Sequence, residues 1–419
     1  MTRLLRLPEL LPALAPAVFA SGLAMLAPPA LGADGAAPAA GGRAGAPAGA
    51  TAVQCAWPAW QAFQARFLQA DGRVIDPASP RGHTVSEAQA YALFFALVQD
   101  DRAVFERILR WTEDNLAAGD LALRLPAWQW GRRDDGTYGV LDDNSAADAD
   151  LWLAYTLGEA GGRWNERRYR ALSSLLAERI LREESALVPG LGRMLLPGAH
   201  GFAPERGRWK LNPSYAPPFL LRWFAMHSGD ARWEELRRGA LRLLVDAAPA
   251  GFAPDWAYFQ EVQDAGRVPG SGSFVLQDLP AADRTGGYDA IRVYLWVGMM
   301  AAADADRAAL LQHFAPMAAA SELVGAPPVA VDAAGPGSTG TAGPPGFSAA
   351  VLPLLAALDR PAALDRQLAR LAAQPAAADA YYDQALSLFG RGWHEGRFAF
   401  AADGSVQLPA RCPAAAGQR

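Results

Sequence analysis

Several features are scarce in this sequence of 419 residues, and each scarcity excludes a class of function. Only 19% of the residues are charged, the formal net charge is −5 and no block of Lys and Arg occurs, so nucleic acid is not an expected partner. Five scattered histidines and two cysteines give no spacing typical of a zinc site. A phosphate-binding loop and a Gly-x-Ser-x-Gly motif are also missing. The sequence therefore predicts neither a metal nor another cofactor.

The two cysteines, Cys55 and Cys412, lie near opposite ends of the part that is expected to fold. In an exported protein an even number of cysteines favours a disulfide, here one that joins the two ends of the domain. Two free thiols are the alternative, which exported proteins seldom keep. We expect the disulfide.

The beginning of the chain resembles an export signal followed by a linker. Arg3 and Arg6 precede an apolar run over 10–26, and small residues follow as far as Ala33, which predicts a signal peptide over 1–33. Residues 34–53 are almost all Ala, Gly and Pro and predict a disordered linker. We expect residues 54–415 to form a single domain, monomeric and located in the periplasm or outside the cell.

Helical periodicity dominates the part after the linker. Strand-like alternation is confined to short segments near 274–276 and 398–400. Six helical hairpins closed into a ring would form an all-α (α/α)6 toroid, in which helix ends and long loops surround a cleft. An open array of helical repeats is the alternative, but the sequence has no fixed repeat period. Twelve candidate helices lie near 57–69, 85–98, 102–117, 145–160, 166–183, 216–228, 231–247, 288–303, 305–321, 347–358, 361–373 and 379–390.

The connections between the predicted helices include four long loops, at 123–143, 188–215, 248–287 and 324–346. Loops of this length within a domain are usually functional. Their aromatic side chains are suited to stacking on sugar rings, although some are expected to fill the core. These aromatics are Trp128, Trp130, Tyr138, Trp209, Trp256, Tyr258 and Phe259.

Asp148 lies in a stretch where a carboxylate adjoins two aromatic residues. Asn144 or Ser145 is predicted to cap a helix, which places Asp148, Trp152 and Tyr155 on one face. A helix start favours the ionised form of an acid, so Asp148 is expected to be charged. An ionised acid beside flat rings suits a sugar-binding groove. The simpler alternative is an Asp that only interacts with the helix dipole.

Glu87 lies at the start of the second predicted helix. The simplest interpretation of this start is a capping box, in which Thr84 caps the helix and Glu87 bonds back to the Thr84 amide. The functional alternative is a proton donor: Glu87 shares a helix face with Tyr91, and alanines and aromatics around it would reduce its solvation. Lost solvation raises the pKa of a carboxyl group and suits it to donate a proton.

Asp289 begins a further predicted helix, with Arg292 three residues later. A surface ion pair at this spacing would contribute at most about 0.5 kcal/mol. The neighbours Ile291, Tyr294 and Leu295 leave the helix little surface to expose, so we expect both charges to line a cavity. An ionised Asp289 beside arginine could there orient and deprotonate a water molecule.

Glu87, Asp148 and Asp289 share one position, the first turn of a helix that follows a loop. In a toroid, inner helices that begin on the same side bring their first turns together around one cleft. Two carboxyl groups in unlike environments, one acid and one base, are what glycoside hydrolysis requires. The third acid would then hold the sugar ring.

The chain resembles glycoside hydrolase family 8, in particular its periplasmic members from bacterial cellulose-synthesis systems. The resemblance extends from Cys55 to Cys412. It rests on ordered segments at 55–60 (CAWPAW), 73–77 (RVIDP), 86–91 (SEAQAY), 125–131 (LPAWQWG), 189–192 (PGLG), 211–215 (LNPSY), 288–294 (YDAIRVY) and 346–350 (GFSAA).

This resemblance implies an (α/α)6 barrel that cleaves internal β-1,4-glucosidic bonds of cellulose with inversion. Glu87 is similar in position to the family's general acid, and Asp289 to the base. Asp148 matches the acid of the family signature and would bind the ring at the point of cleavage. Ala147 and Ala88 depart from the family pattern but remove no carboxyl group.

We expect a β-1,4-glucan chain as the partner, bound by side chains around these acids. The sequence does not determine whether the protein also contacts a cellulose synthase complex. A polysaccharide lyase on a similar toroid is one alternative, disfavoured because few basic residues lie near the acids. A non-catalytic glucan-binding scaffold is the other. The predicted substrate-binding residues are Tyr91, Trp130, Asn144, Trp152, Asn212, Tyr215, Tyr288 and Arg292.

Overall fold

The computed structural model describes residues 56–79, 81–203, 207–262, 271–276, 279–335 and 340–409. These residues belong to one unit, Gly49–Arg419. The predicted signal peptide, the predicted linker and both cysteines of the predicted disulfide lie outside the described residues. Within the described ranges, no helix has both the length and the apolarity that crossing a membrane requires.

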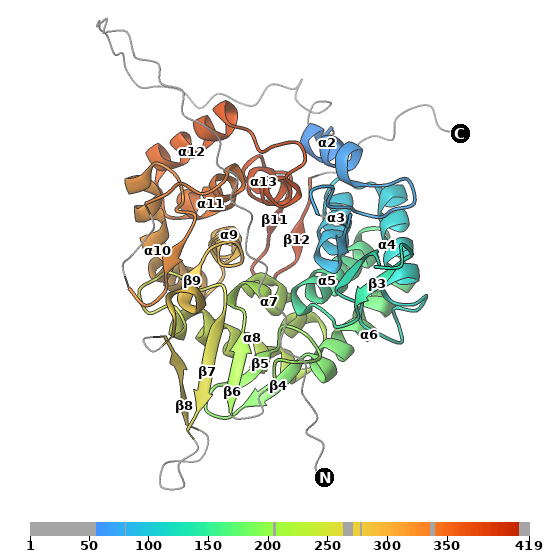
Figure 1. Ribbon diagram of the computed structural model, residues 1–419, viewed down its shortest axis with the longest axis horizontal. Helices are drawn as coiled ribbons and strands as arrows, with labels where there is room; N and C mark the ends of the chain where they lie inside the picture. Colours follow the sequence, from blue (N-terminus) through green and yellow to red (C-terminus); the bar gives the residue numbers. More distant parts are fainter. Residues whose placement is uncertain are drawn as a thin grey trace, which may run out of the picture. The chain divides into compact units, whose positions relative to one another are not determined.

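Six helices contact one another in series and form an inner ring (Figure 1). The ring closes where Phe389 of the last helix meets Phe95 of the first, with ring centroids 4.7 Å apart. Helices buried on every side need no polar face, which explains their apolar sequences. The inner helices are α3 (Ser86–Val98), α5 (Ala147–Arg163), α7 (Pro218–His227), α9 (Ile291–Met299), α11 (Pro345–Ala357) and α13 (Tyr381–His394).

Six amphipathic helices cover the inner ring from outside. The predicted (α/α)6 fold is therefore confirmed, although the helices do not pair in simple sequence order. The first helix packs on α13, so the first and last helices of the described chain make one pair. The outer helices are α2 (Pro58–Phe67), α4 (Arg102–Leu116), α6 (Arg167–Glu183), α8 (Ala231–Asp246), α10 (Arg307–Val324) and α12 (Pro361–Ala373).

Short turns connect each of α3, α5, α7, α9 and α11 to the outer helix that follows it. Four of these turns contain a residue with positive φ, which reverses the chain within a few residues: Asp100, Asn165, Gly229 and Asp359. Asp230 then caps α8 by accepting a hydrogen bond from the Arg232 amide. This end of the barrel therefore has little room for a site.

The long connections lead into the inner helices at the opposite end, and they contain short antiparallel strands. The strands escaped sequence analysis because so few residues cannot establish an alternating pattern. Only the segment that overlaps β8 was expected. They are β1 (Thr84–Val85) with β2 (Gln129–Arg132) and β3 (Tyr138–Asp142); β4 (Ser185–Val188) with β5 (Gly192–Leu195); β6 (Arg208–Leu211) with β7 (Ala257–Glu261) and β8 (Gly272–Val275); and β9 (Thr285–Gly286) with β10 (Val331–Asp332).

A C-terminal hairpin, β11 (Ala399–Phe400) and β12 (Val406–Gln407), fills the ring at the end with the short turns. Phe400 stacks on Phe219 of α7, and the Tyr155 hydroxyl donates a hydrogen bond to the Gly404 carbonyl at 2.9 Å. The predicted strand near 398–400 is confirmed. With one end filled by aromatic side chains, only the end with the long loops remains for a substrate.

Candidate active site

Arg292 in the first turn of α9 connects residues from three inner helices. Its side chain is 4% exposed. One terminal nitrogen donates to Asp148 Oδ2 at 3.2 Å and to the Tyr91 hydroxyl at 3.3 Å. The other donates to Asp289 Oδ1 at 3.0 Å and to Ser214 Oγ at 2.9 Å. Asp148 and Asp289 therefore meet at Arg292, as expected, although Asp289 precedes the first turn of α9.

Glu87 joins the same group from the first turn of α3. Desolvation raises the pKa of Glu87, the charge of Asp289 adds to the increase, and Arg292 opposes it. A hydrogen bond from the Trp128 side chain also favours the ionised form, whereas the buried Oε2 atom has no partner within the described residues. The prediction of a desolvated carboxyl group that retains its proton is therefore supported for Glu87.

The capping box predicted for α3 is wrong. Thr84 lies in β1, and its hydroxyl donates to the Val74 carbonyl at 2.7 Å while it accepts from Arg73 Nε at 2.8 Å. The residue that caps α3 is Val85, which offers no side-chain hydrogen bond. Glu87 is thus not needed to close the helix start, and its carboxyl group is available for chemistry.

The helix cap predicted before Asp148 is also wrong. Helix α5 begins after Ala146, which makes no side-chain cap. Asn144 and Ser145 instead bond to other segments, Asn144 to the backbone of His200. The helix start alone favours an ionised Asp148, but burial, reinforced by the charge of Glu87, raises the pKa of Asp148 well above its usual range.

One guanidinium therefore faces three carboxyl groups. Arg292 lowers the pKa of Glu87 and of Asp148, yet burial outweighs it for both groups. Acids that interact this strongly titrate as a set, and burial favours a proton held by Glu87 or Asp148. The site thus combines a proton donor with carboxylates, as acid–base chemistry requires.

Asp289 differs from Asp148 in its access to solvent. The Asp289 side chain is 33% exposed and that of Asp148 only 2%. Asn212 donates to Asp289 Oδ2 at 3.1 Å, while Arg292 holds the other oxygen. A carboxyl group held on both oxygens and still open to solvent is suited to orient a water molecule.

Asp255 fixes the turn that carries Asp289, and sequence analysis did not identify it. Its Oδ1 accepts hydrogen bonds from the amides of Gly287, Asp289 and Ala290 at 2.8, 2.9 and 2.8 Å. Because α9 begins only at Ile291, Asp289 lies in this turn rather than inside the helix. No motif marks an Asp within a long loop, so only the folded chain reveals its partners.

Gly286 allows this turn to approach the preceding loop. A Cβ atom on Gly286 would lie 1.8 Å from the Ala253 carbonyl oxygen, which no side chain tolerates. The Ala253 amide in turn donates a hydrogen bond to the Tyr294 hydroxyl of α9 at 2.9 Å. The loop that contains Asp255 is thereby held directly against the start of α9.

Aromatic rings extend away from Arg292 along the loops. The Arg292 guanidinium lies 5.5 Å from the centre of the Tyr215 ring, and Trp256 lies 6.1 Å from Tyr215. Phe202 is nearly parallel to Trp256 with centroids 6.2 Å apart, and Lys210 Nζ lies 4.0 Å from the centre of the Trp256 ring. Such a row of rings is suited to stacking on successive sugar units.

Known proteins match the chain over most of its length. The model of "Glycosyl hydrolases family 8" matches residues 47–396. The chain belongs to glycosyl hydrolase family 8. An endoglucanase from Escherichia coli is 47% identical over 354 residues, which cover 84% of this chain and 91% of the relative. An endoglucanase from Xanthomonas axonopodis is 45% identical over 384 residues, 90% of this chain and 96% of the relative.

A solved family 8 structure has the same architecture. The endo-1,4-D-glucanase from Vibrio fischeri superposes with a TM-score of 0.76 at 40% identity, over 84% of this chain and 99% of that chain. The family and the fold expected from the ordered sequence segments are therefore both confirmed.

Tyr91, Asn212 and Tyr215, three of the residues predicted to bind substrate in this family 8 protein, lie in the group around Arg292. Tyr288 lies near it, next to Asp289, with 48% of its surface exposed. Its position at the rim leaves a ring face accessible to a sugar.

The prediction that Trp152 binds substrate needs correction. Its ring is 0% exposed and packs against Tyr91, Phe94, Trp296 and other rings of the barrel core. A sugar cannot reach it, because the inner helices close around it. The spacing that placed Trp152 on the face of Asp148 describes its helix correctly but says nothing about the helices packed against it.

Trp130 also lies away from the acids. Its ring contacts Trp111 and Tyr138, with centroids 5.2 and 5.4 Å apart, and Arg73 covers one face at 4.3 Å. With residues of α4, Trp130 lines a separate pocket of about 480 Å³. The neighbouring Trp128 contacts Glu87 instead, so the contacts favour Trp128 over Trp130 beside the acid.

Asn144, the remaining predicted binding residue, holds a loop. Its amide donates to the His200 carbonyl at 2.9 Å and its oxygen accepts from the His200 amide at 3.1 Å. Both polar atoms are thus used within the protein, and no contact of Asn144 with the acids is present among the described residues.

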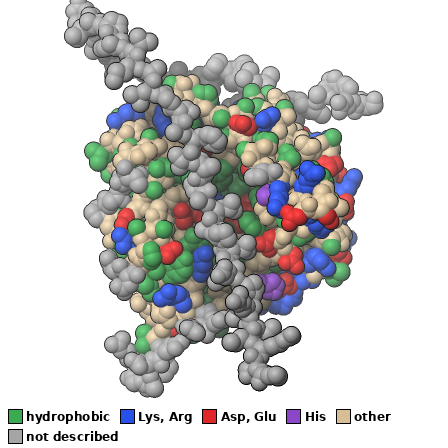
Figure 2. Space-filling model, viewed as in Figure 1, with side chains coloured by type: hydrophobic (Ala, Val, Ile, Leu, Met, Phe, Trp, Pro, Cys, Tyr) green, Lys and Arg blue, Asp and Glu red, His purple; other side chains and the backbone are tan. Residues whose placement is uncertain are grey.

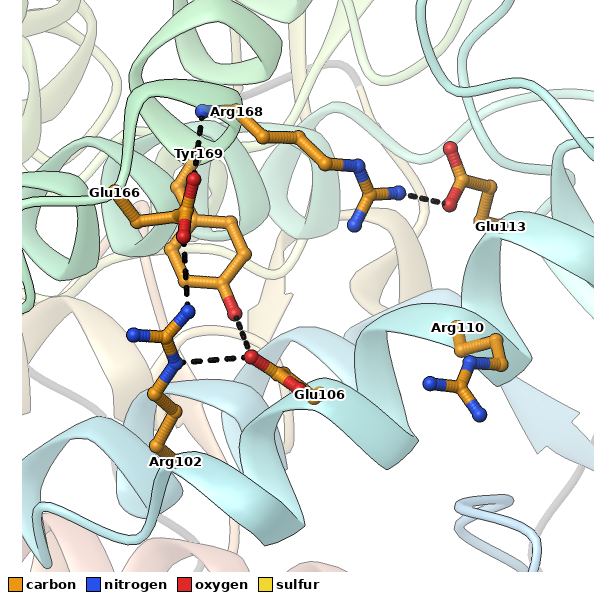
Figure 3. Close-up of a pocket in the computed structure, with 7 residues that line it drawn as sticks. All are labelled: Arg102, Glu106, Arg110, Glu113, Glu166, Arg168 and Tyr169. Carbon is orange, nitrogen blue, oxygen red and sulfur yellow. Dashed lines mark hydrogen bonds and ion pairs between the residues drawn. The ribbon is translucent and has the colours of Figure 1, made fainter.

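A second group of arginines and acids occupies a pocket of about 230 Å³ between the outer helices α4 and α6 (Figure 3). We call it the outer cluster; Figure 2 shows basic and acidic side chains intermingled on this side of the molecule. Its ion pairs connect side chains that are between 17% and 53% exposed. The outer cluster consists of Arg102, Glu106, Arg110, Glu113, Glu166, Arg168 and Tyr169.

Proposed function

We propose that this family 8 enzyme hydrolyses β-1,4-glucan by inversion, with Glu87 as general acid and Asp289 as general base. Family membership and endoglucanase relatives at 45–47% identity make the protein an endo-1,4-β-glucanase. The observation that supports the assignment of roles is the difference between the carboxyl groups. Desolvation raises the pKa of Glu87 and favours its protonated form, whereas Asp289 is open to solvent and held by two donors.

The reaction follows from these positions. Glu87 protonates the oxygen of the leaving sugar, and a water molecule oriented by Asp289 attacks the anomeric carbon from the other side of the ring. Asp289 accepts the proton of that water. Asp148, which lies beside Glu87 and pairs with Arg292, is assigned to hold the ring at the cleavage point, and the rings of Tyr215 and Trp256 support neighbouring sugar units.

The stereochemistry of the first product tests this assignment. Inversion requires room for water between the two carboxyl groups, roughly 6.5–9.5 Å, and yields the α-anomer from a β-glucan. Proton NMR of a freshly digested cello-oligosaccharide should therefore show α-anomer before mutarotation. An early β-anomer signal would refute inversion and make Asp148 or Asp289 a candidate nucleophile.

The location and biological setting are part of the proposal. The apolar run at 10–26 and the small residues up to Ala33 support export to the periplasm, where we place the enzyme as a monomer that trims cellulose during its synthesis. Fractionation of cells that express the full chain tests the location. Recovery of the protein from the cytoplasm with residues 1–33 intact would contradict export.

A further inference from the structure

Two more carboxyl groups are buried beside the active site, and the reaction described above does not use them. Asp150 lies in the first turn of α5, two residues after Asp148, and Glu184 follows the last residue of α6. Both residues are 0% exposed. Both oxygens of Asp150 and Oε2 of Glu184 lack a hydrogen-bond donor among the described residues.

A proton between these groups would give one oxygen of each a hydrogen-bond partner. Two carboxylates only accept hydrogen bonds, so they can bond to each other only when one of them is protonated. Asp150 and Glu184 lie within hydrogen-bonding reach of each other. Burial raises the pKa of Glu184 to about 8 and the pKa of Asp150 well above its usual range.

Among the described residues, the charged groups with the largest effects on the pKa values of this pair are acidic. Asp148 and Glu87 raise the pKa of Asp150 further, and Glu183 raises that of Glu184. The Ser145 hydroxyl, which is neutral, is the other partner of Glu184. In such surroundings a proton costs less free energy than two unbalanced charges.

Glu184 also connects the segments that carry Asp148. Ser145 Oγ donates to Glu184 Oε1 at 2.5 Å and accepts from the Ala199 amide at 3.1 Å. The Leu196 amide donates to the Glu184 carbonyl at 2.8 Å. The start of α5, the end of α6 and the loop at 196–199 therefore meet at Glu184.

The loop at 196–199 packs tightly on the start of α5. The Ala147 amide donates to the Pro197 carbonyl at 3.0 Å. A Cβ atom on Gly198 would lie 2.4 Å from the Ser145 carbonyl oxygen, so the loop approaches the helix start as closely as glycine allows. A displacement at Glu184 would thus be transmitted to the first turn of α5.

We propose that Asp150 and Glu184 share a proton and thereby hold the first turn of α5 where Asp148 meets Arg292. The two acids are positioning residues, since neither touches the substrate. Loss of the shared proton places two charges side by side without a counterion, and the start of α5 then moves away from the end of α6. The effect on rate rests on the role proposed for Asp148, whereas the shared proton does not.

Thermal unfolding tests the shared proton without any activity. The folded pKa of Glu184 lies above its unfolded value of 4.5, so the folded form binds a proton that the unfolded form releases, and stability falls as pH rises from 4.5 to about 8. In a Glu87→Gln background, which removes that acid's own titration, Tm should fall between pH 5 and 9. Adding Glu184→Gln should make this fall smaller, while the other buried acids, such as Asp148 and Asp255, contribute equally to both proteins. An equal fall in both proteins would overturn the shared proton.

An infrared spectrum gives an independent readout. A protonated carboxylic acid has a carbonyl stretch separate from that of carboxylates and amides. In the Glu87→Gln background this band should be present at pH 7 and should weaken when Asp150→Asn and Glu184→Gln are combined. An unchanged spectrum would contradict a protonated pair.

The pH dependence of kcat tests the positioning role. Glu184→Gln should retain most of its kcat at pH 6, because the amide can donate to Asp150, and the alkaline limb of its pH profile should move to higher pH. Asp150→Ala should lower kcat more than KM, and Asp150→Asn should restore it. If Tm responds to these changes while the alkaline limb stays at its native position, the pair is structural only and the positioning role is refuted.

Discussion

The group around Arg292 and the outer cluster contain the same types of residue in very different surroundings. Each combines arginine, carboxyl groups and a tyrosine hydroxyl. In the outer cluster, Arg102 and Glu106 pair at 2.9 Å with side chains 44% and 43% exposed. Around Arg292, the side chains of the pair with Asp148 are 4% and 2% exposed.

The surroundings reverse the direction of the pKa shifts. The hydrogen bond from Arg102 lowers the pKa of Glu106, because water still solvates the ionised form. Burial raises the pKa of Glu87 and of Asp148 although Arg292 lies beside them. An ion pair at the surface therefore consists of two ionised groups, whereas burial favours the protonated form that an acid-catalysed reaction needs.

The largest expected difference between the two groups is in turnover. Glu87→Gln should lower kcat by about 10²- to 10⁴-fold, because an amide cannot protonate the leaving oxygen. Release of reducing ends from carboxymethylcellulose measures the loss, and binding of cellopentaose should stay near native. Glu106→Gln in the outer cluster is the matched control with native kcat. Near-native turnover by Glu87→Gln would contradict the assignment of Glu87 as the general acid.

Loss of the central cation should be the next largest effect. Arg292→Met leaves Asp148 and Asp289 without their shared partner, and removing one member of a buried ion pair costs about 3–5 kcal/mol of stability. Urea unfolding at pH 7 measures the change. Arg292→Lys keeps the charge but not the forked geometry, so it should be more stable than Arg292→Met yet slow in catalysis. Equal stability of wild type and Arg292→Met would contradict a buried, coupled pair.

Asp255 should produce a pH dependence of stability. Burial raises the pKa of Asp255 to about 6 from 3.8, so the folded form binds the proton more tightly and stability falls as pH rises through this interval. The fall should amount to at most about 3 kcal/mol. Asp255→Asn removes this contribution, so the difference in unfolding free energy between Asp255→Asn and wild type should change from pH 4 to 7. A difference in unfolding free energy that does not vary with pH would contradict the raised pKa of Asp255.

The smallest effect is expected in the outer cluster. Glu106→Gln removes an exposed ion pair and should change the unfolding free energy by less than about 1 kcal/mol. Raising the salt concentration should weaken the native pair further, since exposed charges are screened. A loss of unfolding free energy as large as that of Arg292→Met would show that solvent exposure does not explain the difference between the outer cluster and the group around Arg292.

The sequence was sufficient to predict the fold class and to identify the candidate catalytic residues. Helical patterning predicts the twelve-helix barrel, because the outer helices repeat their burial every turn and the inner helices are apolar on nearly every side. Glu87, Asp148 and Asp289 were identifiable since each is an acid in an apolar or aromatic stretch near a helix start. The ordered segments between residues 55 and 350 also identified family 8, which the comparison with known proteins confirms.

Only the tertiary structure decided what each of these residues contacts. The capping roles predicted for Thr84 and Asn144 failed because partners distant in sequence, Val74 and His200, bind their side chains instead. Trp152 shares a helix face with Asp148, yet packing of neighbouring helices seals it in the core.

Asp255 and the pair Asp150–Glu184 carry no local signal at all. Their pKa values rise because folding removes water and brings acids together from separate segments. Local sequence determines which residues share a helix face. The desolvation of an acid depends on everything that packs against that face, so it is determined only when the ring of helices closes.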